Sequence, residues 1–325
     1  MSEALIAVRA VHFAASALTA GIVVFAIVVV WPALASAGEA AADTVARFAT
    51  VARRLYLASV VLAVVSGALW LVLVSAGIAE QSPSAVLLDG TAWTLLTGTR
   101  FGLMSQFRAI MALFLVQVVL LFGSRPVFVG LNAASLVVLI VSLGFVGLLG
   151  FAGHGGATPD AEGYVHLGAD ILHLIAASAW LGGLAPLVWL LRRLERDEQG
   201  ALIAVRVLQR FSILGIVSVA MLAATGAVNS WFLVGSLFAL TNTDYGALLL
   251  LKIALFIAMV TLAALNRLVL MPRLVANAKA SGRGLDELQI IGGNALLEFL
   301  LGLGVVAVVA VLGILAPAAH QFHLH

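Results

Sequence analysis

Eight long apolar stretches divide the chain, and they constrain its fold more than any other feature of the sequence. In lipid every backbone N–H and C=O group must be satisfied within the chain, and a helix of roughly 20 apolar residues crosses the hydrocarbon core. The chain is 63% hydrophobic and only 10% charged, which is more apolar surface than a water-soluble core absorbs. The sequence therefore predicts an all-α, polytopic membrane bundle of eight transmembrane helices. The predicted spans are 5–31, 53–76, 101–122, 127–150, 166–191, 211–234, 247–270 and 291–315.

The first apolar stretch has some features of a cleaved signal peptide. Arg9 precedes it, and Ala33-Leu34-Ala35 has the composition of a cleavage site. However, the stretch is too long for a usual signal core and carries His12. We therefore interpret it as a retained first helix.

Several function classes are excluded by what the sequence lacks. The chain has no cysteine, which excludes disulfides, thiolate metal sites and cysteine nucleophiles. No GxxxxGK[ST] loop, HExxH motif or Ser-His-Asp arrangement occurs, so neither an ATP-driven pump nor a hydrolase is indicated. No basic patch with interleaved aromatic residues points to nucleic acid. We therefore expect neither an enzyme nor a nucleic-acid-binding protein, and the lipid bilayer is the expected surroundings.

The distribution of lysine and arginine predicts the orientation of the chain. Of the 17 basic residues, all but Arg9, Arg100, Arg108 and Lys252 fall on one side of the predicted bundle. By the positive-inside rule that side is cytoplasmic, so both termini are external. The external connection 77–100 contains Trp93 within a Thr-rich apolar segment, which predicts a short amphipathic helix in the outer interface.

A stripe of ionisable residues begins the fifth span. His166, Asp170 and His173 are spaced i, i+4 and i+7, so on a helix they share one face. Ionisable residues within a membrane helix are expensive and mark functional sites by default. The other histidines also fall on the external side or near it, and these are His12, His154, His320, His323 and His325.

The two halves of the chain resemble one another. Thr99-Arg-Phe-Gly102 followed by Arg108 matches Thr243-Asp-Tyr-Gly246 followed by Lys252 at a constant spacing. The surroundings of His12 and His173 also match, as do those of His154 and His320. We expect a tandem, parallel repeat of four helices, with units at 1–150 and 166–325. The repeat predicts that His12 pairs with His173 and His154 with His320, near the axis at the outer surface.

Neutral imidazole binds copper, zinc, iron and nickel, so the histidines are candidate metal ligands. The first-choice site combines His12, His173 and His166, with Asp170 either orienting a ring or binding the metal itself. His154 and His320 either complete this site or form an outer one. The alternative for any single histidine is an ordinary buried or interface role. The tail residues His323 and His325 either collect metal or have no specific role.

Other polar residues in the spans have alternative roles. Met104 and Met111 offer soft thioethers for Cu(I), or simply pack. Arg9, Arg108 and Lys252 either repel cations or hold an anionic partner, or they snorkel to the headgroups or pair with Asp170. Arg108 and Lys252 share a repeat position, which suggests a common structural role. Glu298 is either a proton or ion relay or a partner of Arg267 or Asn266. Asn229 is expected to form an interhelical hydrogen bond.

The chain resembles the bacterial copper resistance protein D (CopD) family. The segments that carry the resemblance are His173-Leu-Ile-Ala-Ala-Ser-Ala-Trp180-Leu-Gly-Gly183, Thr225-Gly226 with Trp231, Tyr245-Gly246 through Lys252, Asn266-Arg267, Leu297-Glu298, Leu315-Ala-Pro317, and in the first half His12, Gly67-Ala-Leu-Trp70 and Thr99-Arg-Phe-Gly102 with Arg108. The resemblance implies an eight-helix inner-membrane protein that handles copper, with a periplasmic CopC-type copper-binding protein as a partner.

The favoured hypothesis is a membrane protein that accepts copper at the periplasmic face and mediates its import. The first alternative is a membrane electron carrier or metal reductase that holds haem b between two histidines. The second is an external metal-binding or sensing protein that transports nothing. A visible spectrum separates the haem hypothesis from the others, and vesicle uptake separates import from sensing.

Overall fold

The computed structural model describes residues 2–35, 42–152, 160–194, 198–281 and 285–321, and within these ranges the chain is helical without a strand. Eight of its helices are long and apolar enough to cross a membrane, which confirms the predicted number of spans. They run over Glu3–Ala35, Ala42–Ala79, Arg100–Phe122, Ala133–Ala152, Glu162–Arg193, Gln199–Val234, Asp244–Asn277 and Asp286–Leu312.

Several spans consist of more than one helical segment. The main helices are α1 (Ser2–Val24), α3 (Ala42–Ala79), α6 (Arg100–Phe122), α8 (Ala133–Gly147), α9 (Asp160–Arg193), α10 (Glu198–Val234), α12 (Asp244–Leu265) and α14 (Leu285–Leu312). The shorter segments are η1 (Phe25–Val30), α2 (Trp31–Ala35), α4 (Pro83–Leu88), α5 (Thr91–Gly98), α7 (Ser124–Phe128), η3 (Leu148–Ala152), α11 (Leu237–Asn242), η5 (Asn266–Leu270), α13 (Met271–Ser281) and α15 (Ala318–Gln321).

The helices extend beyond the predicted spans mainly at the arginine-rich end. The helix α3 has 38 residues, so it is about 57 Å long, whereas the hydrocarbon core is only about 30 Å thick. Hydropathy detects the part of a helix that lies in lipid and not the part that continues into water. The fourth span begins later than the predicted residue 127, because Asn132 caps α8, which starts at Ala133. The residues before this cap form the separate helix α7.

The helices α1 and α9 form the centre of the bundle. In each of them 72% of the most apolar window is buried, whereas no other span exceeds 44%. Their backbones approach closely at two glycines: a Cβ added to Gly21 would lie 2.4 Å from the Gly182 backbone, and a Cβ added to Gly182 would lie 2.3 Å from the Ala17 carbonyl oxygen. Glycine is required at this crossing because any side chain would separate the two helices.

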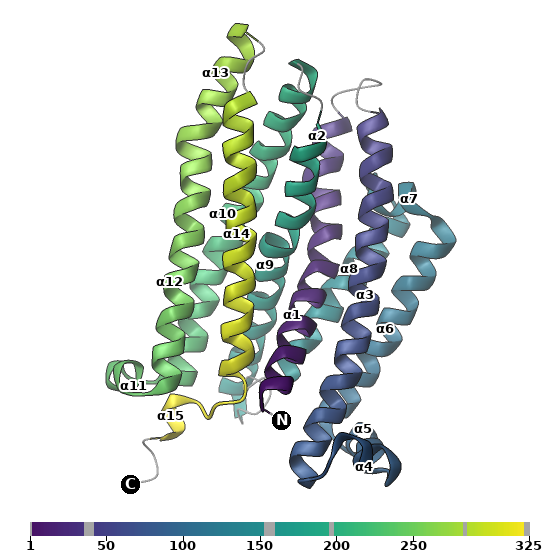
Figure 1. The fold of residues 1–325 in the computed structure, drawn as a ribbon, viewed down its shortest axis with the longest axis vertical. Coiled ribbons are helices and arrows are strands. Elements are labelled where there is room, and N and C mark those ends of the chain that lie inside the picture. The colour runs from purple at the N-terminus through teal and green to yellow at the C-terminus, as the bar shows by residue number, and fades with distance from the viewer. Residues whose placement is uncertain (1, 36–41, 153–159, 195–197, 282–284, 322–325) are drawn as a thin grey trace.

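Both ends of the described chain lie at the same end of the bundle (Figure 1). The short helices α4, α5, α11 and α15 also lie there, while α2, α7 and α13 lie at the opposite end. The predicted short helix is confirmed as α5, and its Trp93 is 68% exposed. The short helices α5 and α11 lead directly into the spanning helices α6 and α12. These two spanning helices carry the basic residues Arg108 and Lys252.

Candidate functional site

His12 lies on α1 and is buried against α3 and α6, with 4% of its surface exposed. Its Nδ1 lies 2.9 Å from the carbonyl oxygen of Ala63 and 3.1 Å from Oγ of Ser66. Its Nε2 lies 3.0 Å from Nη2 of Arg108. A guanidinium group can only donate hydrogen bonds, so Nε2 accepts and Nδ1 carries the proton. Both ring nitrogens of His12 are therefore engaged.

Arg108 joins three helices at this point. Its Nη2 also donates to Oγ of Ser16 on α1 at 2.9 Å, and its Nη1 donates to the carbonyl oxygen of Phe145 on α8. The guanidinium carbon lies 3.9 Å from the centre of the Phe145 ring, a cation–π distance. Arg108 is buried and directed into the bundle, so it orients His12 instead of reaching the membrane surface.

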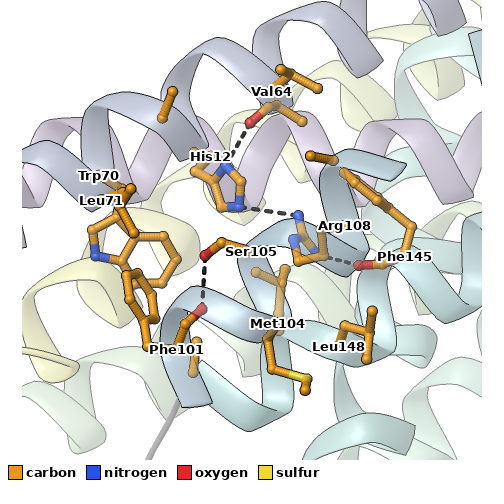
Figure 2. A pocket seen from close by; sticks show the side chains of 16 residues that line it. His12, Val64, Trp70, Leu71, Phe101, Met104, Ser105, Arg108, Phe145 and Leu148 are labelled. Atoms are coloured by element: carbon orange, nitrogen blue, oxygen red, sulfur yellow. Dashed lines mark hydrogen bonds between the residues drawn. The ribbon is translucent and has the colours of Figure 1, made fainter. Parts of the chain in front are cut away.

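A cavity of about 140 Å³ adjoins His12 and Arg108. Figure 2 shows the two side chains pointing toward one another, with Trp70, Phe101 and Met104 around them. The Trp70 ring centre lies 5.4 Å from that of His12 in an edge-on arrangement. Met104 therefore shares a cavity with His12. Met111 does not line it, and its terminal methyl group packs against Gly144 of α8 instead.

The predicted ionisable stripe lies on α9. His166 is buried, with 1% of its surface exposed, and its ring stacks on Phe232 of α10 at 4.8 Å. Its Nε2 lies 4.0 Å from Oδ2 of Asp170. The other oxygen of Asp170 accepts a hydrogen bond of 2.6 Å from Nδ2 of Asn229 on α10, which is the interhelical bond expected for Asn229. Two members of the stripe thus lie side by side and face α10.

His173 is held through one ring nitrogen only. Its Nδ1 lies 2.9 Å from Oγ1 of Thr225, whose single hydroxyl proton is donated to the carbonyl oxygen of Met221 at 2.6 Å. Thr225 must therefore accept, so Nδ1 of His173 carries the proton and Nε2 carries the lone pair. Within the described residues Nε2 of His173 makes no hydrogen bond. It differs in this respect from Nε2 of His12, which Arg108 occupies.

Lys252, the predicted counterpart of Arg108, lies on α12. It lies close enough to Asp170 and His173 to interact with both electrostatically. No hydrogen bond joins Lys252 to either side chain in the described part of the chain. A cation is thus present near each of the two intramembrane histidines His12 and His173, but only Arg108 blocks a ring nitrogen.

The two histidines are supported in the same way. Ser66 and Thr225 each accept from a histidine Nδ1 and donate to the carbonyl oxygen four residues earlier in their helix. The next residue is a glycine in both cases, and a Cβ there would lie 3.0 Å and 3.7 Å from Cε1 of His12 and His173, respectively. The histidines were predicted from the sequence as candidate ligands, whereas no role was predicted for these hydroxyl groups. The paired Ser-Gly and Thr-Gly dipeptides were the available signal.

The short helices before α6 and α12 also share one geometry. Thr99 caps α6 by accepting from Gly102 N at 3.0 Å, and Thr243 caps α12 by accepting from Gly246 N at 2.9 Å. A Cβ on Gly102 would lie 2.2 Å from a carbonyl oxygen of α5, and one on Gly246 would lie 2.1 Å from a carbonyl oxygen of α11. These tight turns fix the register of the helices that carry Arg108 and Lys252.

The structure does not bring His12 and His173 together. The ring of His12 faces α3 and α6, whereas the ring of His173 faces α10, so they point into different halves of the bundle. Among the described residues no group of three or more His, Asp or Glu side chains is arranged to hold a metal ion. His154, His323 and His325 lie outside the described residues, and His320 lies in α15 with a side chain that is likewise not described.

Glu298 lies on α14 and is buried. Its Oε1 accepts a hydrogen bond of 2.9 Å from Nδ2 of Asn266, so Asn266 and not Arg267 is the observed partner. Arg267 donates instead to Oγ of Ser212 on α10.

Comparison with protein families gives two matches. The family described as "Copper resistance protein D-like, N-terminal domain" matches residues 1–167, and the family described as "Copper resistance protein D" matches residues 205–312. Residues between these segments, which include His173, are matched by neither.

Three named proteins are similar to parts of the chain. Copper resistance protein D of Pseudomonas syringae pv. tomato is 36% identical over 184 residues, which cover 55% of this chain and 59% of that protein. Inner membrane protein YebZ of Escherichia coli (strain K12) is 32% identical over 183 residues, covering 56% and 59%. Copper transport protein CutJ of Bacillus subtilis (strain 168) is 38% identical over 125 residues, covering 38% and 23%. No solved structure matches the chain.

Proposed function

The chain belongs to the copper resistance protein D family, and from this membership we propose that it accepts copper at the external face of the inner membrane and mediates its import. The names of its relatives refer to copper resistance, copper transport and the inner membrane. The alignment spans 59% of the length of the first two relatives, so copper as substrate and import as activity are proposals for this chain. The eight membrane-crossing helices are consistent with such a role.

The copper site is proposed at the outer end of α9, and one observation carries this assignment. Nε2 of His173 bears a lone pair that no described group occupies, while Nδ1 is fixed by Thr225. Asp170 and His166 extend along the same face of the helix. Imidazole nitrogen is a good copper ligand, and a hydrogen bond to the other ring nitrogen sets the tautomer that can bind.

The cavity beside His12 is proposed as a second copper-binding site. Met104 offers a thioether there, and thioethers favour Cu(I). Because Arg108 donates to Nε2 of His12, copper can bind this ring only after the guanidinium group moves. His154 and His320 remain proposed ligands at the outer surface, with His323 and His325 in the adjoining tail.

The orientation of the protein is proposed from charge. Most lysines and arginines belong to helices near the end of the bundle opposite α5, α11 and α15, and by the positive-inside rule this supports an orientation with the termini, α5 and α11 outside. This orientation exposes the His166 end of α9 to the periplasm, where a CopC-type protein would deliver copper. The paired surroundings of His12 and His173 support a tandem four-helix repeat with units at 1–150 and 166–325.

The haem alternative is less well supported by these contacts. Axial ligation of haem b by His12 and His173 needs one free nitrogen on each ring. Arg108 and Ala63 engage both nitrogens of His12, and the two rings face different helices. A visible spectrum still decides the matter, because a haem protein has a strong Soret band and a copper protein of this kind has none.

The first test is metal analysis together with a visible spectrum of the full chain purified in detergent from copper-supplemented cells. We expect copper without a Soret band, and loss of that copper in His173→Ala. Vesicles containing the purified chain should then accumulate copper. Bound copper without uptake would favour the non-transporting alternative, whereas iron with a Soret band would refute the copper proposal.

A further inference from the structure

Glu298 and two amides form a buried polar group in the half of the bundle nearer α13. Glu298 has 2% of its surface exposed, and its Oε1 accepts from Asn266 Nδ2 at 2.9 Å. The Oδ1 of Asn266 accepts in turn from Asn294 Nδ2 at 2.8 Å. Asn294 and Glu298 are four residues apart on α14 and therefore face the same neighbour. The chain of hydrogen bonds holds the carboxyl group in one orientation.

The backbone at Asn266 is itself unusual. Asn266 is the first residue of the π-helix η5, and the span continues on either side of it as ordinary helix. Such π-helical turns are rare and occur frequently at functional sites. Here the turn carries both Asn266, which binds Glu298, and Arg267, which binds Ser212. Among the described residues, the irregular turn thus supplies the one hydrogen bond to the carboxyl group.

A cavity of about 360 Å³ lies beside this group and is lined by Glu298 and Asn266. The residues that α9, α10, α12 and α13 contribute to its wall are uncharged, and η5 contributes Arg267. That guanidinium group is bonded to Ser212 and forms no ion pair with Glu298 within the described residues. The second oxygen of Glu298 has no hydrogen-bond partner among the described residues. The helix α1 also packs on α14, but its charged residues, Glu3 and Arg9, belong to the beginning of α1, and Arg9 donates to the carbonyl oxygen of Gly313, just beyond the last residue of α14.

A carboxylate in these surroundings needs a positive charge, and neutral amides do not provide one. An isolated charge buried in an apolar region costs several kcal/mol even after relaxation. A metal ion would require several oxygen or nitrogen ligands, but Asn266 uses both ends of its amide in hydrogen bonds. A proton requires only the free oxygen of the carboxyl group.

We propose that Glu298 is a proton-binding site, which takes up one proton from water on its free oxygen and releases it again through the adjoining cavity. The proposal goes beyond copper handling and does not rest on it. The amides of Asn266 and Asn294 are positioning groups, since they orient the carboxyl group without exchanging the proton.

The test is infrared difference spectroscopy of the full chain reconstituted in lipid, recorded while the pH is changed in H₂O and in D₂O. Protonation of a buried carboxyl group produces a C=O stretching band that shifts on deuteration. We expect one such band to be lost in Glu298→Gln and displaced in Glu298→Asp. Glu287→Gln, which removes a carboxyl group from the start of the same helix, is the matched control and should leave the band unchanged.

Two outcomes would overturn the proposal. The first is a spectrum of Glu298→Gln that equals that of the wild type. The second is a band that depends on sodium or potassium concentration at fixed pH, which would show that a metal cation occupies the carboxylate. If Glu298→Gln fails to fold, an unaltered band in Glu298→Asp counts equally against it. None of these readings uses copper, so failure of the copper proposal leaves this test intact.

Discussion

Nη2 of Arg108 lies 3.0 Å from Nε2 of His12, and this contact occupies the ring nitrogen that a metal would otherwise use. In the second half of the bundle, Nε2 of His173 makes no hydrogen bond among the described residues. Two histidines in matching surroundings thus differ in their readiness to bind a metal.

Replacing Arg108 by glutamine should convert His12 into a metal ligand. The variant should bind more copper than the wild type, and the additional copper should be absent from a variant that also carries His12→Ala. Because Arg108 also donates to Ser16 and Phe145, the free energy of unfolding should fall by about 1.5–3 kcal/mol, as measured by thermal unfolding in detergent. Unchanged copper content in a folded Arg108→Gln protein would mean that the guanidinium group does not control this site.

Thr225→Val should weaken copper binding at His173 by about 10–100-fold, because Thr225 fixes the tautomer and the orientation of the ring. Equilibrium competition with a copper chelator measures this change. Ser66→Ala is the matched control, since Ser66 supports His12 in the same way but His12 is occupied by Arg108. Equal effects of the two substitutions would contradict the assignment of the site to α9.

The sequence predicted the eight spans because membrane helices have a strong and local apolar signal. It placed the ends of the helices less well. The helices α3 and α10 begin before the predicted spans, with segments whose charged residues lower their hydropathy. The direction of the histidine rings was not predictable in the same way. His12 is 96 residues from Arg108 in the chain, and periodicity within one apolar helix does not reveal which neighbour a given face contacts.

Polar pairs within the membrane were predicted only as alternatives. The sequence left Glu298 as a proton or ion relay or as a partner of Arg267 or Asn266, and the observed bond to Asn266 follows from the π-helical turn, which has no sequence signal. The partner of Asn229 on α9 likewise required the packing of α9 against α10.

The loop before α5 has a predictable pH dependence. The pKa of Asp89 lies below its ordinary value of 3.8, because the backbone N–H of Thr91 donates to its carboxylate at 2.9 Å. The charged form is stabilised in the folded loop, so this contribution is present above the unfolded pKa and is lost as the pH falls through the lower folded pKa. A carboxyl ¹³C titration of aspartate-labelled protein should give a midpoint below 3.8 for the signal that Asp89→Asn removes. A midpoint at or above that value would contradict the hydrogen bond.

Gly21→Ala should separate the two central helices. Its Cβ would lie 2.4 Å from the backbone of Gly182, and neither backbone can move without displacing α1 or α9. Overpacking of this kind costs about 1–3 kcal/mol, which thermal unfolding in detergent would detect. Gly168→Ala is the control on α9, because a Cβ there meets nothing within 4 Å and alanine favours a helix over glycine.

His12 and His173 each precede the crossing glycine of their own helix by nine residues. Displacement at Gly21 should therefore also reduce copper binding at His173, although neither glycine touches that ring. Full copper affinity in a destabilised Gly21→Ala protein would show that the crossing does not position the site.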